Sequence, residues 1–173
     1  MSSQKPAETI LEVNQLSHYF DGRRGTVKAV DNISFELEAG ETLGIVGESG
    51  SGKSVTALSL MRLLAIPPRL RHVGEILFQS YILGRSDLRK LPDDAIRLIR
   101  GDEIGMIFQE PRSAMNPVFT CGNHAIETVM AHQKIEYDEA RSKILELFDQ
   151  VRLGNPTQKF DAYPHQLSGG ELQ

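Results

Sequence analysis

A glycine-rich run gives the first indication of the fold: Gly47-Glu48-Ser49-Gly50-Ser51-Gly52-Lys53-Ser54. It matches the spacing G-x-x-x-x-G-K-[ST] and lies between an apolar run, residues 42–46, and a segment of helical character that begins at Lys53. Glycine permits positive φ angles and lets main-chain N–H groups approach phosphate oxygens that a Cβ would keep away. The N-terminus of the following helix adds a partial positive charge. The run therefore predicts a loop that binds the phosphates of a nucleotide, within an α/β fold.

Two side chains of this loop have predicted roles. Lys53 would supply a cation for the β- and γ-phosphates, and Ser54 a hydroxyl ligand for Mg²⁺. The alternative is a flexible Gly/Ser turn that matches the spacing by chance, which the expected strand–loop–helix order disfavours. A GTPase would ordinarily add an Asn-Lys-x-Asp guanine-binding run, and the sequence contains none.

Around the loop, the pattern predicts strands of two kinds. Apolar residues alternate with polar ones over residues 11–13 and 33–37, which is typical of half-exposed antiparallel strands. Residues 21–25 and 39–41 have the composition of turns. Residues 42–46 and 104–108 are nearly continuous apolar runs, and we expect buried core strands there.

The remaining segments predict helices. One runs from Lys53 to about Leu64 and ends before Pro67-Pro68, and a short one runs from about Pro92 to Arg100. The last third looks wholly helical, with one helix near residues 126–130. Another is amphipathic, and its apolar positions are Ala140, Ile144, Leu147, Phe148 and Val151.

Composition excludes several classes of protein. The 173 residues are 40% hydrophobic and 24% charged with a net charge of -4, which argues against a membrane span and against a dedicated nucleic-acid binder. A single cysteine, Cys121, rules out an internal disulfide and indicates a reducing compartment. The five histidines show no zinc-ligand spacing. We expect residues 1–9 to be a flexible N-terminus without the apolar run of a signal peptide.

A second motif ends the sequence, Leu167-Ser168-Gly169-Gly170-Glu171-Leu172-Gln173. Ser168 and Glu171 have the spacing of a capping box at a helix start. That interpretation leaves the two adjacent glycines unexplained, since glycine is unfavourable in a helical turn. A Ser-Gly-Gly start suits phosphate binding, and both interpretations can hold together.

The glycine-rich loop and LSGGELQ together resemble the ATP-binding subunits of ABC transporters, in which LSGGQ-type runs are the signature motif. Between them, Ile107-Phe108-Gln109-Glu110-Pro111 is similar to that family's Q-loop. The resemblance implies that Gln109 helps to bind Mg²⁺ and the attacking water, so that Lys53 and Gln109 are the catalytic candidates. It implies that Ser168, Gly169 and Gly170 face a nucleotide. It also implies an aromatic residue under the adenine, Phe20, with Tyr19 as the neighbouring candidate.

Further runs resemble the oligopeptide, dipeptide and nickel importer branch, notably Gly105-Met106-Ile107-Phe108-Gln109-Glu110-Pro111 and Tyr163-Pro164-His165-Gln166. The resemblance implies an ATP-binding subunit of an importer, with peptides as the expected cargo. Its cofactors would be ATP and Mg²⁺. Its partners would be a second ATP-binding subunit, identical or different, the membrane subunits and, indirectly, a solute-binding protein, but no nucleic acid. It would be peripheral, on the cytoplasmic side of the inner membrane, with no transmembrane segment.

The implied fold is an α/β P-loop NTPase core with an antiparallel β subdomain and a helical subdomain. Residues 10–173 would form a partial nucleotide-binding domain. Residues 10–110 would hold the β subdomain and P-loop core, and residues 111–173 the helical subdomain.

In the family, the signature helix leads to an apolar strand ending in Asp and a catalytic Glu, then to a switch His. The sequence contains none of these after Gln173, so the C-terminal part of the core is expected to be missing. We expect negligible ATP hydrolysis and uncovered apolar surface along residues 42–46 and 104–108. One alternative is a non-hydrolysing remnant that only binds nucleotide. A soluble ATPase of DNA repair or translation is disfavoured by the importer-like insert at residues 67–100.

Overall fold

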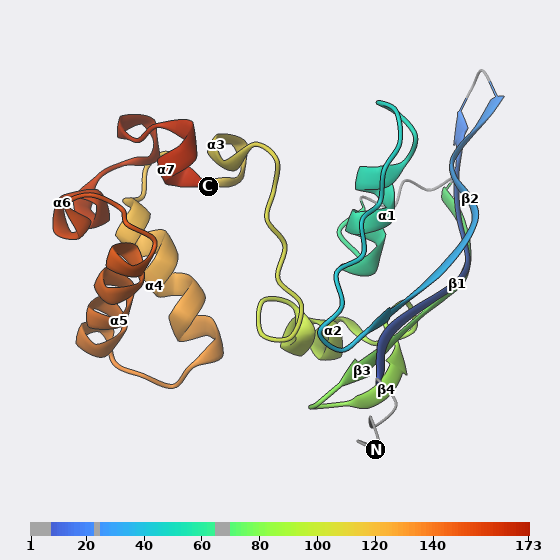
Figure 1. Ribbon diagram of the computed structural model, residues 1–173, viewed down its shortest axis with the longest axis horizontal. Coiled ribbons are helices and arrows are strands. Elements are labelled where there is room, and N and C mark those ends of the chain that lie inside the picture. The colour runs from blue at the N-terminus through green and yellow to red at the C-terminus, as the bar shows by residue number, and fades with distance from the viewer. Residues whose placement is uncertain (1–7, 23–24, 65–69) are drawn as a thin grey trace, which may run out of the picture. The chain divides into compact units, whose positions relative to one another are not determined.

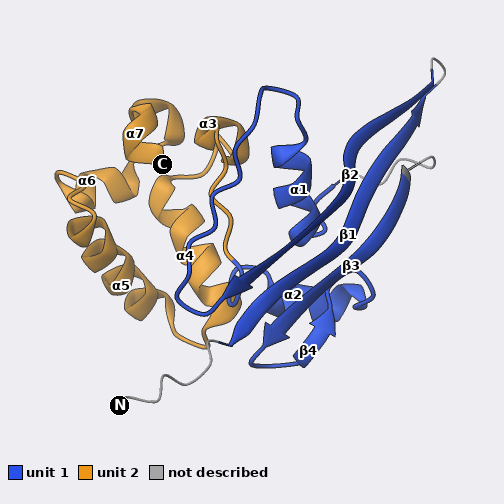
Figure 2. Cartoon of the chain, turned by 45° about the vertical axis from the view of Figure 1, so that its right-hand side comes forward, with its two compact units in different colours: residues 1–104 blue, residues 105–173 orange. Residues whose placement is uncertain are grey.

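The computed structural model describes residues 8–22, 25–64 and 70–173. The chain divides into two compact units, residues 1–104 and 105–173 (Figure 2). The predicted flexible N-terminus, residues 1–9, lies mostly outside the described residues, and its last residue, Thr9, begins a strand. Arg23-Arg24 of the first predicted turn and Pro67-Pro68 also lie outside them. The predicted domain boundary near residue 110 stays a prediction, because a compact unit need not be a domain that folds alone.

The first unit contains a four-stranded antiparallel sheet (Figure 1). Its strands are β1 (Thr9–Gly22), β2 (Gly25–Glu38), β3 (Leu70–Ser80) and β4 (Gly84–Asp87), in the order β2-β1-β3-β4. Val13 of β1 faces Phe35 of β2 on one side and Ile76 of β3 on the other. The two predicted antiparallel strands are therefore confirmed and are longer than expected, whereas β3 and β4 were not predicted.

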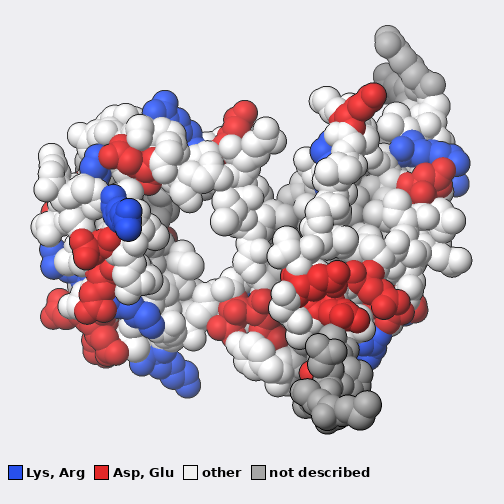
Figure 3. Space-filling model, in the orientation of Figure 1, with Lys and Arg blue, Asp and Glu red and all other residues white. Residues whose placement is uncertain are grey.

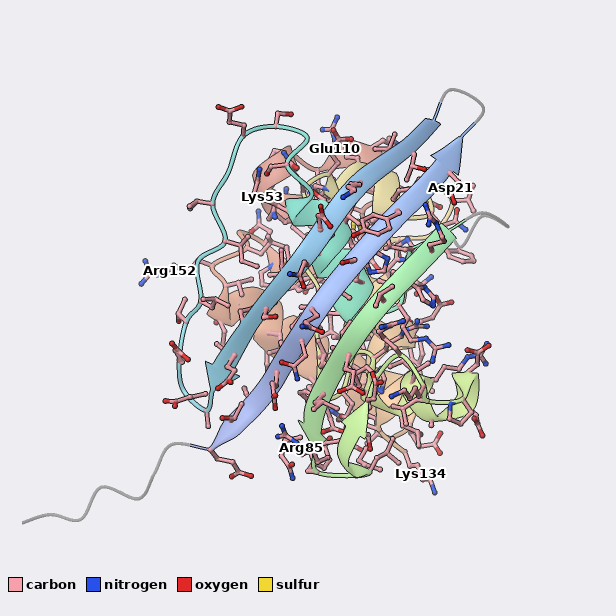
Figure 4. The ribbon with its side chains drawn as sticks, turned by 90° about the vertical axis from the view of Figure 1, so that its right-hand side faces the viewer. Asp21, Lys53, Arg85, Glu110, Lys134 and Arg152 are labelled. Carbon is pink, nitrogen blue, oxygen red and sulfur yellow. The ribbon has the colours of Figure 1, made fainter. Side chains whose placement is uncertain are left out.

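Two helices lie on one face of this sheet, α1 (Lys53–Leu60) and α2 (Asp93–Ile99) (Figures 2 and 4). The buried apolar cluster of this unit consists of Val13, Leu16, Val30, Ile76, Leu88, Ile96 and Ile99. The helix predicted at about residues 92–100 is confirmed. The helix predicted to reach Leu64 is four residues too long, because the structure ends α1 at Leu60.

The two predicted core strands are wrong. Residues 41–48 are irregular, and of residues 104–108 only Ile104 forms an isolated bridge, with Arg100. A strand needs a neighbour to satisfy its backbone N–H and C=O groups, and the described residues offer these two segments no strand partner beyond the single bridge at Ile104. The expected exposure is confirmed, since the side chains of Val46 and Ile107 are 92% and 80% exposed.

The second unit is helical, as predicted. It comprises α3 (Pro111–Ala114), α4 (Cys121–His132), α5 (Tyr137–Gln150), α6 (Pro156–Asp161), a 3₁₀ turn (Pro164–Gln166) and α7 (Gly169–Leu172).

A small apolar core holds α4, α5 and α6 together, formed by Ile126, Ala140, Ile144 and Phe160. Of the predicted apolar face of α5, Ala140 and Ile144 are buried, while Leu147 and Val151 are exposed. No helix in the described part of the chain has the length and hydropathy needed to cross a membrane.

Candidate phosphate-binding site

The loop between residues 47 and 54 owes its shape to two glycines with left-handed backbone angles. Gly50 has φ 82°, and Gly52, the N-cap of α1, has φ 93°. A Cβ on Gly52 would lie 2.0 Å from the carbonyl oxygen of Ala29 in β2, where no side chain fits. Only glycine meets both conditions at this position. The loop thus turns sharply into α1 and exposes main-chain N–H groups at the start of the helix.

Lys53 holds the loop closed. Its ammonium donates hydrogen bonds of 2.7 Å to the carbonyl oxygens of Gly47 and Glu48, and one of 3.3 Å to the hydroxyl of Ser51. Figure 4 shows Lys53 where the loop meets the start of α1. A cation inside the curve of an N–H-rich loop is the arrangement that attracts a phosphate group. The carbonyl contacts are those that a bound phosphate would have to replace.

The donor set suits Mg²⁺ only in part. Ser54 lies exposed on the first turn of α1, and a hydroxyl oxygen is a ligand that this hard cation accepts. No group of three or more His, Cys, Asp or Glu side chains in residues 8–22, 25–64 and 70–173 could hold a metal ion. The residues of this loop therefore fit only a Mg²⁺ that is held mainly by phosphate oxygens and water, and the roles of Ser54 and Gln109 as its protein ligands stay predictions.

The two aromatic candidates for base stacking differ in their surroundings. Tyr19 is engaged by charged groups, because its ring lies 5.4 Å from the Lys28 ammonium and 5.8 Å from the Arg71 guanidinium, and its hydroxyl donates to Asp31. Phe20 is the next residue of β1 and is half-buried, and regular pairing places it on the opposite face of the sheet from Tyr19. That difference favours Phe20 as the stacking residue, which stays a prediction.

Gln109 belongs to the second unit. It lies in the irregular segment before α3 and lines a shallow hollow together with Phe108, Glu110 and two residues of α3. The hydroxyl of Ser113 donates a 2.8 Å hydrogen bond to the carbonyl of Glu110, which fixes the turn into α3. Figure 4 marks this turn by Glu110. These contacts say nothing about Mg²⁺ or water binding by Gln109, and that role stays a prediction.

The signature motif forms the capping box that its spacing predicts. The Glu171 carboxylate accepts hydrogen bonds from the amide and hydroxyl of Ser168, at 2.8 and 2.9 Å, and the Ser168 hydroxyl accepts from the Glu171 amide. Gly169 and Gly170 are exposed in the first turn of α7. Both interpretations of the motif therefore remain compatible, since the cap leaves two glycine N–H groups uncovered by side chains.

Sequence reasoning missed one residue of this motif's structure. Lys159 of α6 forms an ion pair of 2.6 Å with Glu171. The hydrogen bond that the Lys159 ammonium donates within this ion pair is the largest cause of a lowered pKa of Glu171, and the two hydrogen bonds from Ser168 come next. Together they lower this pKa to about 2. The carboxylate is therefore ionised at neutral pH and holds α6 to α7. No local signal identifies Lys159, because the two residues are twelve positions apart.

Comparison with known proteins gives three kinds of likeness. The family described as "ABC transporter" matches residues 30–173. The glutathione import ATP-binding protein GsiA of Pectobacterium atrosepticum is 43% identical over 97% of this chain and 27% of its own length. The oligopeptide transport ATP-binding protein OppD of Bacillus subtilis is 40% identical over 95% of this chain and 44% of its own.

A probable peptide ABC transporter ATP-binding protein of Sinorhizobium fredii, y4tR, is 40% identical over the whole chain and 50% of its own length. The chain thus spans between about a quarter and a half of these relatives. Among solved structures, dimeric MJ0796, a bacterial ABC transporter cassette, has a TM-score of 0.77 at 24% identity, covering 94% of this chain and 65% of its own. That likeness establishes the fold.

Proposed function

Because the chain belongs to the ABC transporter family, we propose that it is the nucleotide-binding part of an ATP-binding subunit that powers import of peptides. In this proposal residues 47–54 bind the phosphates of ATP, Ser54 and Gln109 bind Mg²⁺, and Phe20 stacks on the base. Ser168, Gly169 and Gly170 contact ATP held by a second subunit. Lys53 and Gln109 take part in hydrolysis when the whole assembly is formed.

One observation carries the proposal, the shape of the loop at the start of α1. Two glycines in left-handed conformations, a lysine ammonium in the curve of the loop and a helix N-terminus converge on one exposed site. This combination neutralises phosphate charge and uses main-chain N–H groups as ligands. A flexible Gly/Ser turn would not require Gly52 to pack against Ala29.

The peptide substrate rests on the named relatives. One is named for glutathione import, one for oligopeptide transport and one for peptide transport. We infer that the cargo of this chain's assembly is likewise a short peptide or a peptide-like solute. The cargo itself would be selected by the membrane subunits and a solute-binding protein.

The assembly follows from the same proposal. MJ0796 is a dimer, and a related structure of it is in a post-hydrolysis state bound to ADP and Pi. We infer that this chain pairs with a second ATP-binding subunit, docks on membrane subunits and acts as a peripheral protein at the cytoplasmic side of the inner membrane.

Replacing Lys53 tests the nucleotide site. We expect Lys53→Ala to weaken binding of a fluorescent ATP analogue with Mg²⁺ by about tenfold or more, because a charge-assisted hydrogen bond to phosphate is lost. Lys134→Ala is the matched control, since Lys134 is exposed and lies in the second unit (Figure 4). Equal affinity of the Lys53→Ala variant and the control, at equal thermal stability, would contradict the proposal.

A second candidate function is binding without turnover. Hydrolysis in this class of site needs a carboxylate for Mg²⁺ and a group that positions water. Within the described part of the chain no group of three or more His, Cys, Asp or Glu side chains could hold a metal ion, and from the sequence the Asp and catalytic Glu of the family are expected to be missing. We therefore expect a polypeptide of these 173 residues to bind ATP and release phosphate at a negligible rate. If the polypeptide released phosphate steadily and Lys53→Ala abolished that release, binding without turnover would be refuted. The transport ATPase would then be the remaining candidate.

A further inference from the structure

The first unit contains a small cavity that the phosphate-binding loop does not use. It has a volume of about 90 Å³ and lies between strands β1 and β3 and the C-terminal end of α1. Its lining is rich in nitrogen groups and consists of His18, Ser59, Arg62, Leu64, His72, Ile76 and Arg89. A cavity of this size has room for several water molecules, and hence for one small polyatomic ion.

His18 is the most deeply buried polar group of this cavity. Its side chain is 4% exposed, and neither ring nitrogen has a hydrogen-bond partner among the described residues. Burial, then the neighbouring His72 and Arg89, lower the pKa of His18 to about 4, so that the ring is neutral at pH 7. A buried polar group without a protein partner is costly, and a ligand or water bound in the cavity would satisfy the ring nitrogens of His18.

Two histidine rings meet in the cavity. His72 lies opposite His18 on β3, and the ring centroids are 6.0 Å apart at an interplanar angle of 79°. His72 is exposed, unlike His18, and its pKa is lowered by partial desolvation and by Arg89. A pair of neutral imidazoles could bind a transition metal or donate hydrogen bonds to an anion, so the surrounding charge decides between these ligands.

The surrounding charge is positive. The Arg89 guanidinium donates a 3.3 Å hydrogen bond to the carbonyl of His72, which keeps it beside both rings. Arg62 lies at another wall, where it donates to the carbonyl of Leu91 and its charge is balanced by Asp93 at 2.9 Å, so the positive charge beside the two rings is that of Arg89. A positive potential opposes a metal cation and attracts an anion. The chemistry of this cavity therefore favours an anionic ligand.

We propose that this cavity binds a small inorganic oxyanion of the phosphate or sulfate type, held by Arg89, His72 and His18. Arg89 supplies the charge, and each imidazole donates one N–H to an oxyanion oxygen. This site is separate from the loop at residues 47–54, because that loop contains the first two residues of α1 and the cavity lies at the other end of that helix. It does not depend on the proposed transport function.

Binding at this site is linked to protonation. An anion favours the charged imidazolium, so a bound oxyanion raises the pKa of His18 from its low value. The charged and titratable groups that face His18 are His72 from β3, Arg89 from the segment after β4 and Arg62 from the segment after α1, while its neighbour on β2 is Val30. Affinity should therefore rise as pH falls towards the pKa of His18.

Sulfate is the probe that tests this, because its charge is constant over the relevant pH range. The whole chain would carry Lys53→Ala so that the phosphate-binding loop contributes little, and sulfate would be titrated while imidazole NMR signals are followed. We expect the His18 signals to shift and the affinity to rise several-fold from about pH 8 to about pH 6.

Arg89→Gln is expected to weaken sulfate binding about tenfold or more, whereas Arg97→Gln, an exposed arginine of α2, leaves it unchanged. His72→Asn is a second variant, at an exposed position of β3, and should also weaken binding. The proposal is overturned if sulfate leaves the His18 signals unmoved, or if Arg89→Gln and Arg97→Gln bind it alike. It is also overturned if zinc chloride shifts these signals and Arg89→Gln strengthens that response, since the cavity would then be a metal site.

Discussion

Gly52 and Gly40 both have left-handed backbone angles, with φ of 93° and 80°, yet their surroundings differ. A Cβ on Gly52 would overlap the carbonyl oxygen of Ala29, whereas a Cβ on Gly40 would meet nothing within 4 Å. A substitution at Gly40 therefore measures the loss of stability caused by the backbone angle alone. A substitution at Gly52 adds the loss caused by overlap with Ala29.

We expect Gly40→Ala to lower the free energy of unfolding by about 1 to 2 kcal/mol, the cost of a left-handed alanine. Gly52→Ala should lower it further and abolish ATP binding, because the loop must move away from β2. Urea unfolding measures the first effect and nucleotide titration the second. Equal unfolding midpoints for the two variants would contradict the tight packing at Gly52.

Single residues were predictable from the sequence where their role is local. The loop at residues 47–54 and the Ser168–Glu171 cap follow from short spacings, and the cap is confirmed. Lys159 and the His18–His72 pair were not predicted, because each depends on segments distant in the chain. No short-range pattern carries such information.

In the second unit, α4 and α6 approach each other closely at a glycine. Gly122 of α4 lies against the ring of Phe160 in α6, and a Cβ on Gly122 would come within 2.4 Å of that ring. Phe160 is itself buried in the small apolar core of this unit. The absence of a side chain at Gly122 therefore sets how closely these helices pack.

Gly122→Ala is expected to destabilise the helical unit by about 1 to 3 kcal/mol, the usual cost of overpacking. Combining it with Phe160→Leu should cost less than the sum of the two single changes, because the smaller side chain relieves the overlap. A double-mutant cycle from thermal unfolding measures this coupling. Strict additivity of the two changes would show that the ring does not restrict residue 122.

Elements were predictable where the pattern is regular and its partners are near. The alternation in β1 and β2 and the short helix α2 are confirmed. β3 was missed because it pairs with β1 across some sixty positions and contains Gly74, which has φ 98°. The strands expected at residues 42–46 and 104–108 were wrong, since apolar composition alone does not supply a neighbouring strand.

For the molecule as a whole, two apolar segments of irregular backbone carry strongly exposed side chains. Val46 and Ile107 stand out on irregular backbone at 92% and 80% exposure. Figure 3 shows that acidic side chains gather on the visible face of the first unit, which favours solubility but does not cover such residues. Contiguous exposed apolar surface promotes association.

We expect a protein of residues 1–173 to bind the dye ANS and to self-associate at micromolar concentration. Changing Val46 and Ile107 together to serine should reduce both effects. Val151→Ser is the control, because Val151 is 70% exposed at the end of α5, outside both segments. Light scattering and dye fluorescence measure the outcome. If Val151→Ser reduced dye binding and self-association equally, both effects would come from exposed apolar side chains in general and not from the two segments.

The contact between Gly52 and Ala29 has a consequence for native-state dynamics. In the described sheet β2 is an edge strand, paired with β1 alone. Edge strands open more readily than central ones, and local openings occur in cooperative units. The loop packs against the main chain of β2 where Gly52 meets Ala29. Any opening of β2 removes this contact. We therefore expect the loop conformation proposed to bind phosphate to persist only as long as this edge strand stays paired with β1.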